Sequence, residues 1–341
     1  MNIQTNIPLS TLTTMRIGGN ADRVVNVTSE EELQQAYKNS KELEQPIYII
    51  GDGSNLIVHD EGFAGVIIRI KIMGIDIIDE NQETTTVNSG AGETWDVFVK
   101  QMVERNLSGI ETMSGIPGTV GAAPVQNIGA YGQELADTFV SLRAYDTQSD
   151  DFVTLKKEDC GFAYRHSIFR GEQAERYIIT HVTLALSKQP PQPPFYDALQ
   201  QHLAQQQINI ANVTVQIIRD AVIAIRSNKL PDPNQLPNAG SFFKNPIVPL
   251  QLGETLKASY PDIPIYPVDG MRVKIPAGWL IQSCALKGRI LHGIKVHDGN
   301  AVVLVNHSAQ GYTDLAAARK KITDSVYQKF KITLEQEPLE L

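Results

Sequence analysis

The sequence predicts a protein of mixed α and β structure that folds as two or three domains. Its 341 residues exceed one typical core, because a domain averages about 150 residues. The proline-rich segment 189–194 indicates a polyproline-like linker. Strands dominate much of the chain before this linker, whereas helices and strands alternate in the last third. The predicted class is therefore α+β, with the last third as a separate small α/β domain.

The first part of the chain predicts strands on either side of a glycine-rich turn. A strand is expected at Arg23–Val27, and the capping box Ser29–Glu32 predicts the start of a helix. The apolar strand Pro46–Ile50 leads into the turn 51–55, of sequence GDGSN, and the apolar run Leu56–Val58 follows it. This order of strand, turn and strand differs from the strand, turn and helix of a Rossmann fingerprint.

The middle of the chain predicts a hairpin, a helix and a further set of strands. The runs Ile75–Ile78 and Thr84–Val87 alternate like half-buried strands. A helix is expected after Gly92, because apolar residues follow at helical spacing: Trp95, Phe98, Val99, Met102 and Val103. The next strands are expected at Val140–Tyr145, Phe152–Leu155 and Tyr177–Leu186.

Beyond the linker the sequence predicts mainly helices. The expected helices are Tyr196–Gln206, Thr214–Ser227, Leu250–Tyr260, Gly278–Leu286 and Thr313–Phe330. One strand, Ala301–Val305, is expected among them.

Composition and charge exclude several classes of protein. No apolar run approaches the roughly 18 residues of a membrane span, and the N-terminus lacks the features of a signal peptide, so we expect a cytoplasmic protein with no membrane partner. A net charge of -8 without a basic stripe argues against nucleic acid. Cys160 and Cys284 lie outside any C-x-x-C motif, which predicts reduced thiols and no zinc site. No obligate protein partner is evident.

The segment 238–246, of sequence NAGSFFKNP, is a candidate proton-delivery site. Prolines before it and Pro246 at its end predict a pinned polar loop. The loop holds Ser241, whose hydroxyl carries a transferable proton, and two phenylalanines that can exclude water. An ordinary loop with core phenylalanines is the alternative. A Ser-His-Asp hydrolase using His166 is a further one, although no G-x-S-x-G motif surrounds the serine.

Two glycine-rich stretches predict close approach of the backbone to a ligand. The first is the turn 51–55, and the second is the long segment 114–132, of sequence SGIPGTVGAAPVQNIGAYG. Leu56 stands where a dinucleotide fingerprint would have its third glycine. Stacked backbone N–H groups from both stretches could instead form a nest for a diphosphate, with a dinucleotide lying between two subdomains.

Two charged residues have open interpretations from sequence alone. Arg165 precedes His166 and follows aromatic residues, which is consistent with a rigid guanidinium at a site or with an ion pair at a strand end. Glu337 lies in a tail, where a carboxylate is normally exposed and inert.

Taken together, the motifs resemble the UDP-N-acetylenolpyruvoylglucosamine reductase (MurB) family. The resemblance rests on residues 51–55, 116–132, 164–169 and 238–246, in this order, and extends from Thr14 to the tail. It implies a flavoprotein that uses FAD and NADPH to reduce the enolpyruvyl ether of a UDP-sugar in peptidoglycan synthesis. It also implies a vanillyl-alcohol-oxidase (PCMH)-type fold, in which two α+β subdomains hold FAD and a third domain binds the UDP-sugar.

The resemblance assigns roles to individual residues. Ser241 would protonate the substrate carbon, Arg165 would polarise the enolpyruvyl carboxylate, and Glu337 would be the acidic partner, with Glu335 as the alternative bearer of that role. The implied substrate-binding residues are Tyr196, Lys229 and Asn245. The implied cofactor-binding residues are Gly51, Gly53, Ser54, Asn55, Gly118, Thr119, Gly121, Ala122, Gln126, Asn127, Gly129, Ala130 and Tyr131.

These residue types suit the implied chemistry. Hydride addition to an enol ether needs donors that stabilise the negative charge developing on its carboxylate, and the planar fork of Arg165 matches a carboxylate. The resulting carbanion is basic enough to take a proton from serine. A serine hydrolase of a nucleotide-linked metabolite and a flavin sensor without turnover are the alternatives.

The expected domains follow from the same organisation. They are residues 1–72 and 73–228 for the two FAD-binding subdomains, with an insertion near 188–228, then 229–330 for the UDP-sugar domain and 331–341 for a tail that returns to the active site.

Overall fold

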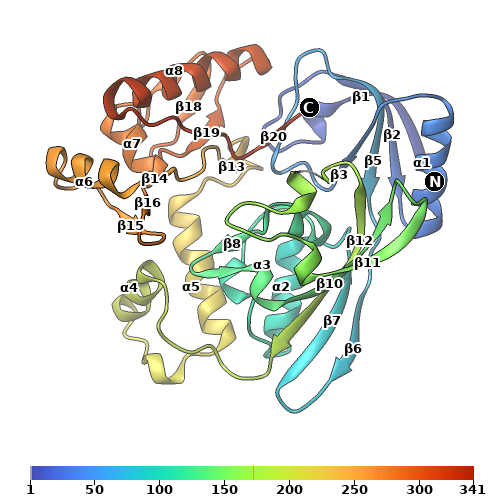
Figure 1. Ribbon diagram of the computed structural model, residues 1–341, viewed down its shortest axis with the longest axis horizontal. Helices are drawn as coiled ribbons and strands as arrows, with labels where there is room; N and C mark the ends of the chain where they lie inside the picture. Colours follow the sequence, from blue (N-terminus) through green and yellow to red (C-terminus); the bar gives the residue numbers. More distant parts are fainter. Residues whose placement is uncertain (1, 172) are drawn as a thin grey trace. The chain divides into compact units, whose positions relative to one another are not determined.

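A computed structural model describes residues 2–171 and 173–341, and the chain forms two compact units. Unit 1 contains the first seven residues together with Ala21–Asp52 and Ala64–Ser227. Unit 2 contains Pro8–Asn20, Gly53–Phe63 and Asn228–Leu341. Both units are therefore discontinuous in sequence, and the blue N-terminal part of the chain contributes to each of them (Figure 1).

Unit 1 is built on two larger sheets. The four-stranded sheet has the order β1 (Asn2–Pro8), β2 (Asn20–Val27), β5 (Phe63–Ile70) and β3 (Ile47–Ile50). The five-stranded sheet has the order β11 (Asp151–Lys156), β10 (Phe139–Asp146), β12 (Tyr177–Ser187), β7 (Thr84–Gly90) and β6 (Ile75–Glu80). Neighbours in the five-stranded sheet are antiparallel, whereas β3 and β5 are parallel. A small pair joins β8 (Gly129–Ala130) and β9 (Gln133–Glu134).

Helices complete unit 1 and share its core. They are α1 (Glu30–Glu42), α2 (Trp95–Glu104), α3 (Leu135–Thr138), α4 (Asp197–Gln205) and α5 (Val215–Lys229). The predicted apolar stripe of α2 is confirmed, because all five of its members are buried. Leu33 of α1 and Val66 of β5 belong to the same buried cluster as that stripe, so one core supports both sheets. Helices α4 and α5 share a smaller cluster that includes Leu203 and Ile218.

Unit 2 combines short strands with three helices. One sheet has the order β13 (Asn238–Ser241), β19 (Val303–Asn306), β18 (Ile294–Val296) and β17 (Ile290–Leu291). A second has the order β14 (Ile247–Pro249), β16 (Arg272–Lys274) and β15 (Tyr266–Pro267), and β20 (Leu339–Glu340) pairs with β4 (Leu56–Ile57). The helices are α6 (Leu250–Ser259), α7 (Ala277–Ser283) and α8 (Tyr312–Phe330).

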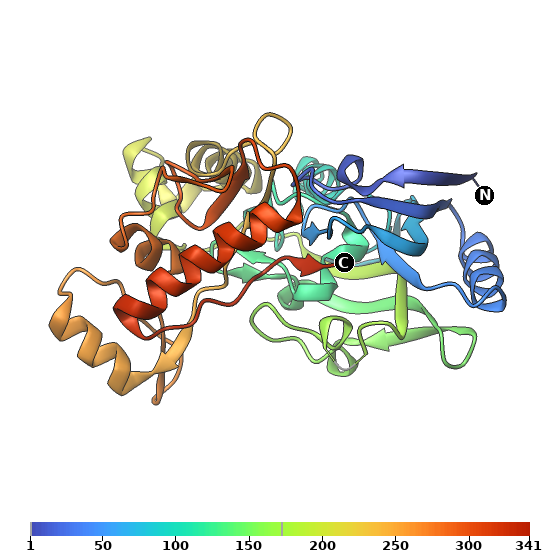
Figure 2. The ribbon, with the colours of Figure 1, turned by 90° about the horizontal axis from the view of Figure 1, so that it is seen from above.

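The C-terminal tail follows α8 back along its own length. Figure 2 shows the tail leaving the far end of α8 and running beside the helix to β20. Leu315, Ile322 and Phe330 of α8 are buried in the same core as Leu334 of the tail. The tail is thus a packed part of unit 2, although a tail of this composition normally frays.

Several observed strands lie where no strand is predicted. The largest is β5, which is the inner strand between β2 and β3. Its run Val66-Ile67-Ile68 carries the signal of a buried strand, with each residue at most 1% exposed. The segment 238–246 also differs from the predicted loop, because its first half is strand β13.

Candidate functional site

Ser241 lies at a bulge in strand β13. This strand pairs antiparallel with β19 through Asn238 opposite Val305 and Ser241 opposite Val303, with an irregular register between the two pairs. Gly240 accommodates the bulge at φ 71, a conformation that favours glycine. The buried Asn238 side chain accepts a hydrogen bond from Gly240 N at 2.8 Å. The bulge therefore fixes where the serine is presented.

The two residues after Ser241 are packed in the core of unit 2. Phe242 and Phe243 are 0% and 1% exposed and pack edge to face, with ring centroids 5.1 Å apart. Both rings are core residues, as the alternative interpretation of this segment expects. Ser241 itself is half-buried, and its hydroxyl has no hydrogen-bond partner among the described residues. Its proton is therefore not committed to the fold.

The tail pairs with this segment through its backbone. Lys244 N donates to Glu335 O, and Glu337 N donates to Phe242 O, both at 2.9 Å. Phe243 and Gln336 form an isolated antiparallel bridge between these bonds. Lys244, to which the sequence assigns no role, forms an ion pair with Glu335. Glu337 is half-buried, whereas the Glu335 side chain is 71% exposed.

The tail then pairs with the glycine-rich turn. Leu339 N donates to Asn55 O at 2.9 Å, and β20 continues in parallel with β4 through Leu339 opposite Leu56. On the other side of the turn, Thr14 Oγ1 donates to Ser54 O at 3.3 Å. Unit 2 thereby brings together the Ser241 segment, Glu337 and the second half of the predicted cofactor turn.

In unit 1, the first half of that turn meets the long glycine-rich segment. A Cβ built on Gly51 would lie 2.6 Å from Thr119 Oγ1, and one on Gly121 would lie 2.5 Å from the Cβ of Ala91. Gly118 adopts φ 112, which also favours glycine. The Gly51 contact leaves no room for a side chain where the two stretches meet, and the Gly121 contact lets the long segment pack closely on Ala91.

Arg165 occupies a tight turn that is tied to the same segment. Ala163 and His166 exchange two backbone hydrogen bonds of 3.0 Å around it, and Arg165 takes the left-handed conformation at φ 52. Its guanidinium donates from Nη2 to Gly129 O at 3.0 Å. Asn127 Nδ2 also donates to Ala163 O at 3.2 Å. The predicted charge stabiliser and two predicted cofactor residues are thus part of one hydrogen-bonded assembly.

The remaining predicted residues have the following positions. Gln126 Oε1 accepts from Arg170 at 2.8 Å, Ala130 O accepts from Thr112 at 3.0 Å, and Asn245 Oδ1 accepts from Ala277 N at 2.9 Å. Tyr131 packs edge to face on Tyr196, with ring centroids 5.9 Å apart. Ala122 and Lys229 are exposed, and Gly53 adopts φ 64.

One supporting group in unit 1 has no counterpart in the sequence analysis. Arg219 of α5 is buried and makes a bidentate contact with Asp96 of α2, at 2.7 and 2.9 Å. Asp96 also accepts from Gly115 N at 2.6 Å, and Arg226 donates to Gly115 O at 3.1 Å. Burial opposes ionisation of Asp96, but these hydrogen bonds hold its pKa below the usual range. An arginine within the apolar face of α5 was the available signal.

The arrangement bears on the alternative chemistries. No cluster of His, Cys, Asp and Glu that could hold a metal occurs in the described part of the chain. Cys160 and Cys284 are free, as predicted, and burial raises the pKa of Cys160 to about 12. His166, considered as a base for Ser241, belongs to the other unit, where its backbone closes the Arg165 turn.

Comparison with known proteins identifies the class and then the family. The model of an FAD binding domain matches residues 21–154, and the model of the UDP-N-acetylenolpyruvoylglucosamine reductase C-terminal domain matches residues 232–340. The protein is thus a flavoprotein of mixed α and β structure, which confirms the predicted FAD-binding fold with its C-terminal domain.

Relatives with this reductase name cover nearly the whole chain. The protein from Ralstonia nicotianae is 38% identical over 97% of both chains, and that from Flavobacterium johnsoniae is 38% identical over 99% of both. A crystal structure of the reductase from Thermus caldophilus has a TM-score of 0.70 at 24% identity, over 100% of this chain and 99% of that one. The chain belongs to the UDP-N-acetylenolpyruvoylglucosamine reductase family, and the resemblance seen in the sequence is confirmed.

Proposed function

We propose that this protein reduces UDP-N-acetylglucosamine enolpyruvate to UDP-N-acetylmuramate, with NADPH as hydride donor, in peptidoglycan synthesis. FAD, when bound, supplies the redox chemistry by accepting a hydride from NADPH and delivering it to the substrate. The close approach of Gly51 to Thr119 and the left-handed Gly118 fit the diphosphate of such a group. The serine-hydrolase and sensor alternatives have no support among the relatives.

Arg165 is proposed to stabilise the substrate carboxylate. Hydride addition develops negative charge on that group, and a preorganised donor there is typically worth about 10²–10³ in turnover. The left-handed turn and the bond from Arg165 to Gly129 O support this role, because they hold the guanidinium in place before substrate binds. Asn127 reinforces the turn from the cofactor segment.

Ser241 is proposed to deliver the proton that completes the reduction. The developing carbanion needs a neutral donor, and general-acid assistance is worth about 10²–10⁴. A hydroxyl without an internal partner, presented at a fixed bulge, supports this assignment.

Glu337 is proposed as the acidic partner, in preference to Glu335. The observation that carries this proposal is the 2.9 Å hydrogen bond from Glu337 N to Phe242 O, next to Ser241. Glu335 is exposed and is neutralised by Lys244, which leaves it a structural role.

Further assignments remain proposals. The other cofactor and substrate residues, the four-part domain division, a cytoplasmic location and action without an obligate protein or nucleic-acid partner are proposed on the sequence evidence. No helix in the described part of the chain is long and apolar enough to span a membrane.

Substitution of Ser241 tests the function. In Ser241→Ala we expect NADPH to reduce the flavin at the normal rate and the enolpyruvyl UDP-sugar to reoxidise it about 10²–10⁴ times more slowly. Stopped-flow absorbance of the flavin separates the two half-reactions. The exposed Ser308 of unit 2 provides the control, and Ser308→Ala should behave as the parent protein. A preparation that takes up no FAD, or equal slowing of both halves, would contradict the proposal.

A further inference from the structure

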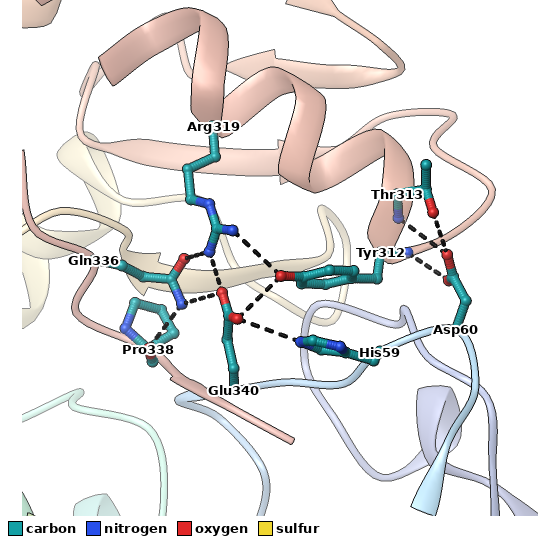
Figure 3. A network of polar contacts seen from close by, with 8 residues as sticks. All are labelled: His59, Asp60, Tyr312, Thr313, Arg319, Gln336, Pro338 and Glu340. Atoms are coloured by element: carbon teal, nitrogen blue, oxygen red, sulfur yellow. Dashed lines mark hydrogen bonds and ion pairs between the residues drawn. The ribbon is translucent and has the colours of Figure 1, made fainter. Parts of the chain in front are cut away.

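Arg319 of α8 faces the tail and is at the centre of a polar network (Figure 3). Its Nη1 donates to Gln336 Oε1 at 2.6 Å and also pairs with the carboxylate of Glu340. Its Nη2 donates to the hydroxyl of Tyr312, which lies two helical turns earlier on α8, at 3.2 Å. The guanidinium therefore spans from the helix to two residues of the tail.

Glu340 receives hydrogen bonds from several elements of unit 2. Its carboxylate accepts from the Tyr312 hydroxyl and from Gln336 Nε2, each at 3.0 Å, and lies 3.3 Å from His59 Nε2. The ring of His59 stacks on Tyr312 with centroids 3.8 Å apart. Burial opposes ionisation, but Arg319 and these donors outweigh it and hold the pKa of Glu340 below 4.5. Both members of the Arg319–Glu340 pair are thus charged at neutral pH.

The first turn of α8 is itself fixed to the segment that carries His59. Tyr312 N and Thr313 N donate to the two carboxylate oxygens of Asp60, at 2.6 and 3.0 Å. A carboxylate at this end of a helix pairs with its unsatisfied N–H groups and its dipole. Figure 3 shows Asp60 at the helix start and Arg319 two turns further along, so the tail is bound to a helix whose first turn is anchored by Asp60.

The tail residues that contact Arg319 lie before and after Glu337 in the sequence. Gln336 precedes Glu337 and Glu340 follows it by three residues, and both contact Arg319. Between them, Pro338 has a fixed φ, and its carbonyl accepts from Gln336 Nε2 at 3.0 Å. With Glu337 N bonded to Phe242 O, the backbone of Glu337 has little freedom to rotate.

We propose that Arg319 is a positioning residue for the proton-transfer half of the reaction, acting through Glu337. The inference rests on the proposed function, in which Glu337 is the acidic partner of Ser241. Arg319 does not contact the reacting atoms in this scheme. It holds Gln336 and Glu340 so that the carboxyl group of Glu337 is preorganised, and small misplacements of such a group can slow a reaction about 10²-fold.

The test compares Arg319→Met with Lys320→Met. The two substitutions remove one positive charge from adjacent positions of α8, but Lys320 is 75% exposed and pairs with Asp324 on the surface of the same helix. We expect Arg319→Met to slow flavin reoxidation by the UDP-sugar about 10- to 100-fold while reduction by NADPH is unchanged. Lys320→Met should leave both rates unchanged. Arg319→Lys keeps the charge but lacks the two terminal nitrogens of the guanidinium group, so its reoxidation rate should lie between those of the parent protein and Arg319→Met.

Amide hydrogen exchange supplies a readout independent of turnover. Arg319→Met should speed exchange at Glu337 and Leu339, whose N–H groups bond to Phe242 O and Asn55 O. Unchanged exchange at both amides would overturn the inference. Equal effects of Arg319→Met and Lys320→Met on reoxidation would also overturn it, because the loss of one positive charge from α8 would then explain the slowing without the contacts of Arg319.

Glu337→Gln separates this inference from the function on which it rests. If Arg319 acts through Glu337, the double variant should reoxidise no more slowly than Glu337→Gln alone. Additive slowing would overturn the positioning role and leave the reductase assignment intact. Normal reoxidation in Glu337→Gln would instead refute the role of Glu337, and with it the positioning role of Arg319. The proposed reductase activity would still be tested separately by Ser241→Ala.

Discussion

Two polar networks of similar composition support different parts of the molecule. In unit 1, Arg219 holds Asp96 beneath the glycine-rich segment, and its side chain is only 10% exposed. In unit 2, Arg319 and Glu340 hold the tail, and their side chains are 28% and 30% exposed. In the first network the guanidinium is largely withdrawn from water, although the Asp96 side chain is 34% exposed, whereas in the second network both charged side chains are partly accessible.

This difference in burial predicts a difference in what each network controls. Removing one partner of a buried pair leaves an uncompensated charge, which destabilises the fold by about 3–5 kcal/mol. An accessible pair contributes about 0–1 kcal/mol, because water replaces the lost partner. The Arg219 network should therefore govern stability, and the Arg319 network should govern the geometry of the tail with little change in stability.

The largest expected effect is the loss of the buried pair. Asp96→Ala should lower the free energy of unfolding by about 3 kcal/mol, because it leaves the buried guanidinium of Arg219 without its carboxylate and Gly115 N without its acceptor. Urea unfolding followed by circular dichroism measures this change. Lys100→Met, an exposed substitution on the same helix as Asp96, should change it by less than about 0.5 kcal/mol. If the two variants were equally stable, the proposed contrast between networks would be lost.

A smaller effect is expected where the two glycine-rich stretches meet. Gly51→Ala places a methyl group 2.6 Å from Thr119 Oγ1, so the Thr119 side chain or one of the two backbones must shift. Overpacking of this kind typically costs about 1–3 kcal/mol. If FAD binding requires the original spacing of the two stretches, a loss of this size in binding free energy lowers the FAD affinity about 5- to 150-fold. Titration of the apoprotein with FAD, followed by flavin fluorescence, measures it. Gly270→Ala, where a Cβ meets nothing within 4 Å, should bind FAD as the parent does.

The smallest expected effect is that of low pH on the stability of the tail. The folded-state pKa of Glu340 lies below its ordinary 4.5, so its stabilisation is complete above about pH 4.5 and is lost as pH falls through the lowered value. Protection of the Leu339 amide, corrected for intrinsic exchange, should fall on acidification by at most about 1 kcal/mol. Salt at 1 M should reduce it at neutral pH as well. Protection that rises on acidification would show that Glu340 is not the anchor.

Much of the fold was predictable because its signals are local. The stripe Trp95–Val103 and the capping residue Ser29 occur within one or two helical turns, and Ser29 Oγ accepts from Glu32 N at 3.2 Å as expected. The box is not complete, because the Glu32 carboxylate bonds to Thr28 N instead of Ser29 N. By contrast, β20 pairs with β4 across most of the chain, and neither short segment carries information about the other.

The candidate site residues could be predicted from local motifs, but the contacts that hold them involve residues distant in sequence. Ser241, Arg165 and Glu337 were named from motifs, and the structure supplies what holds them: the Gly240 bulge, the left-handed turn and the tail pairing. Lys244 could not be assigned from sequence because its partner Glu335 lies 91 residues away. The supporting role of Arg219 was missed for the same reason, since Asp96 is 123 residues distant.

The discontinuity of unit 2 has a consequence for synthesis on the ribosome. Met15, Ile17 and Ile57 emerge early but pack in a core whose other members lie after residue 238. At about 5–20 residues per second, unit 1 can be complete on the order of ten seconds before that core. During this interval these early apolar side chains lack their native partners from beyond residue 238, so the nascent chain carries hydrophobic residues that the last-made third of the protein covers.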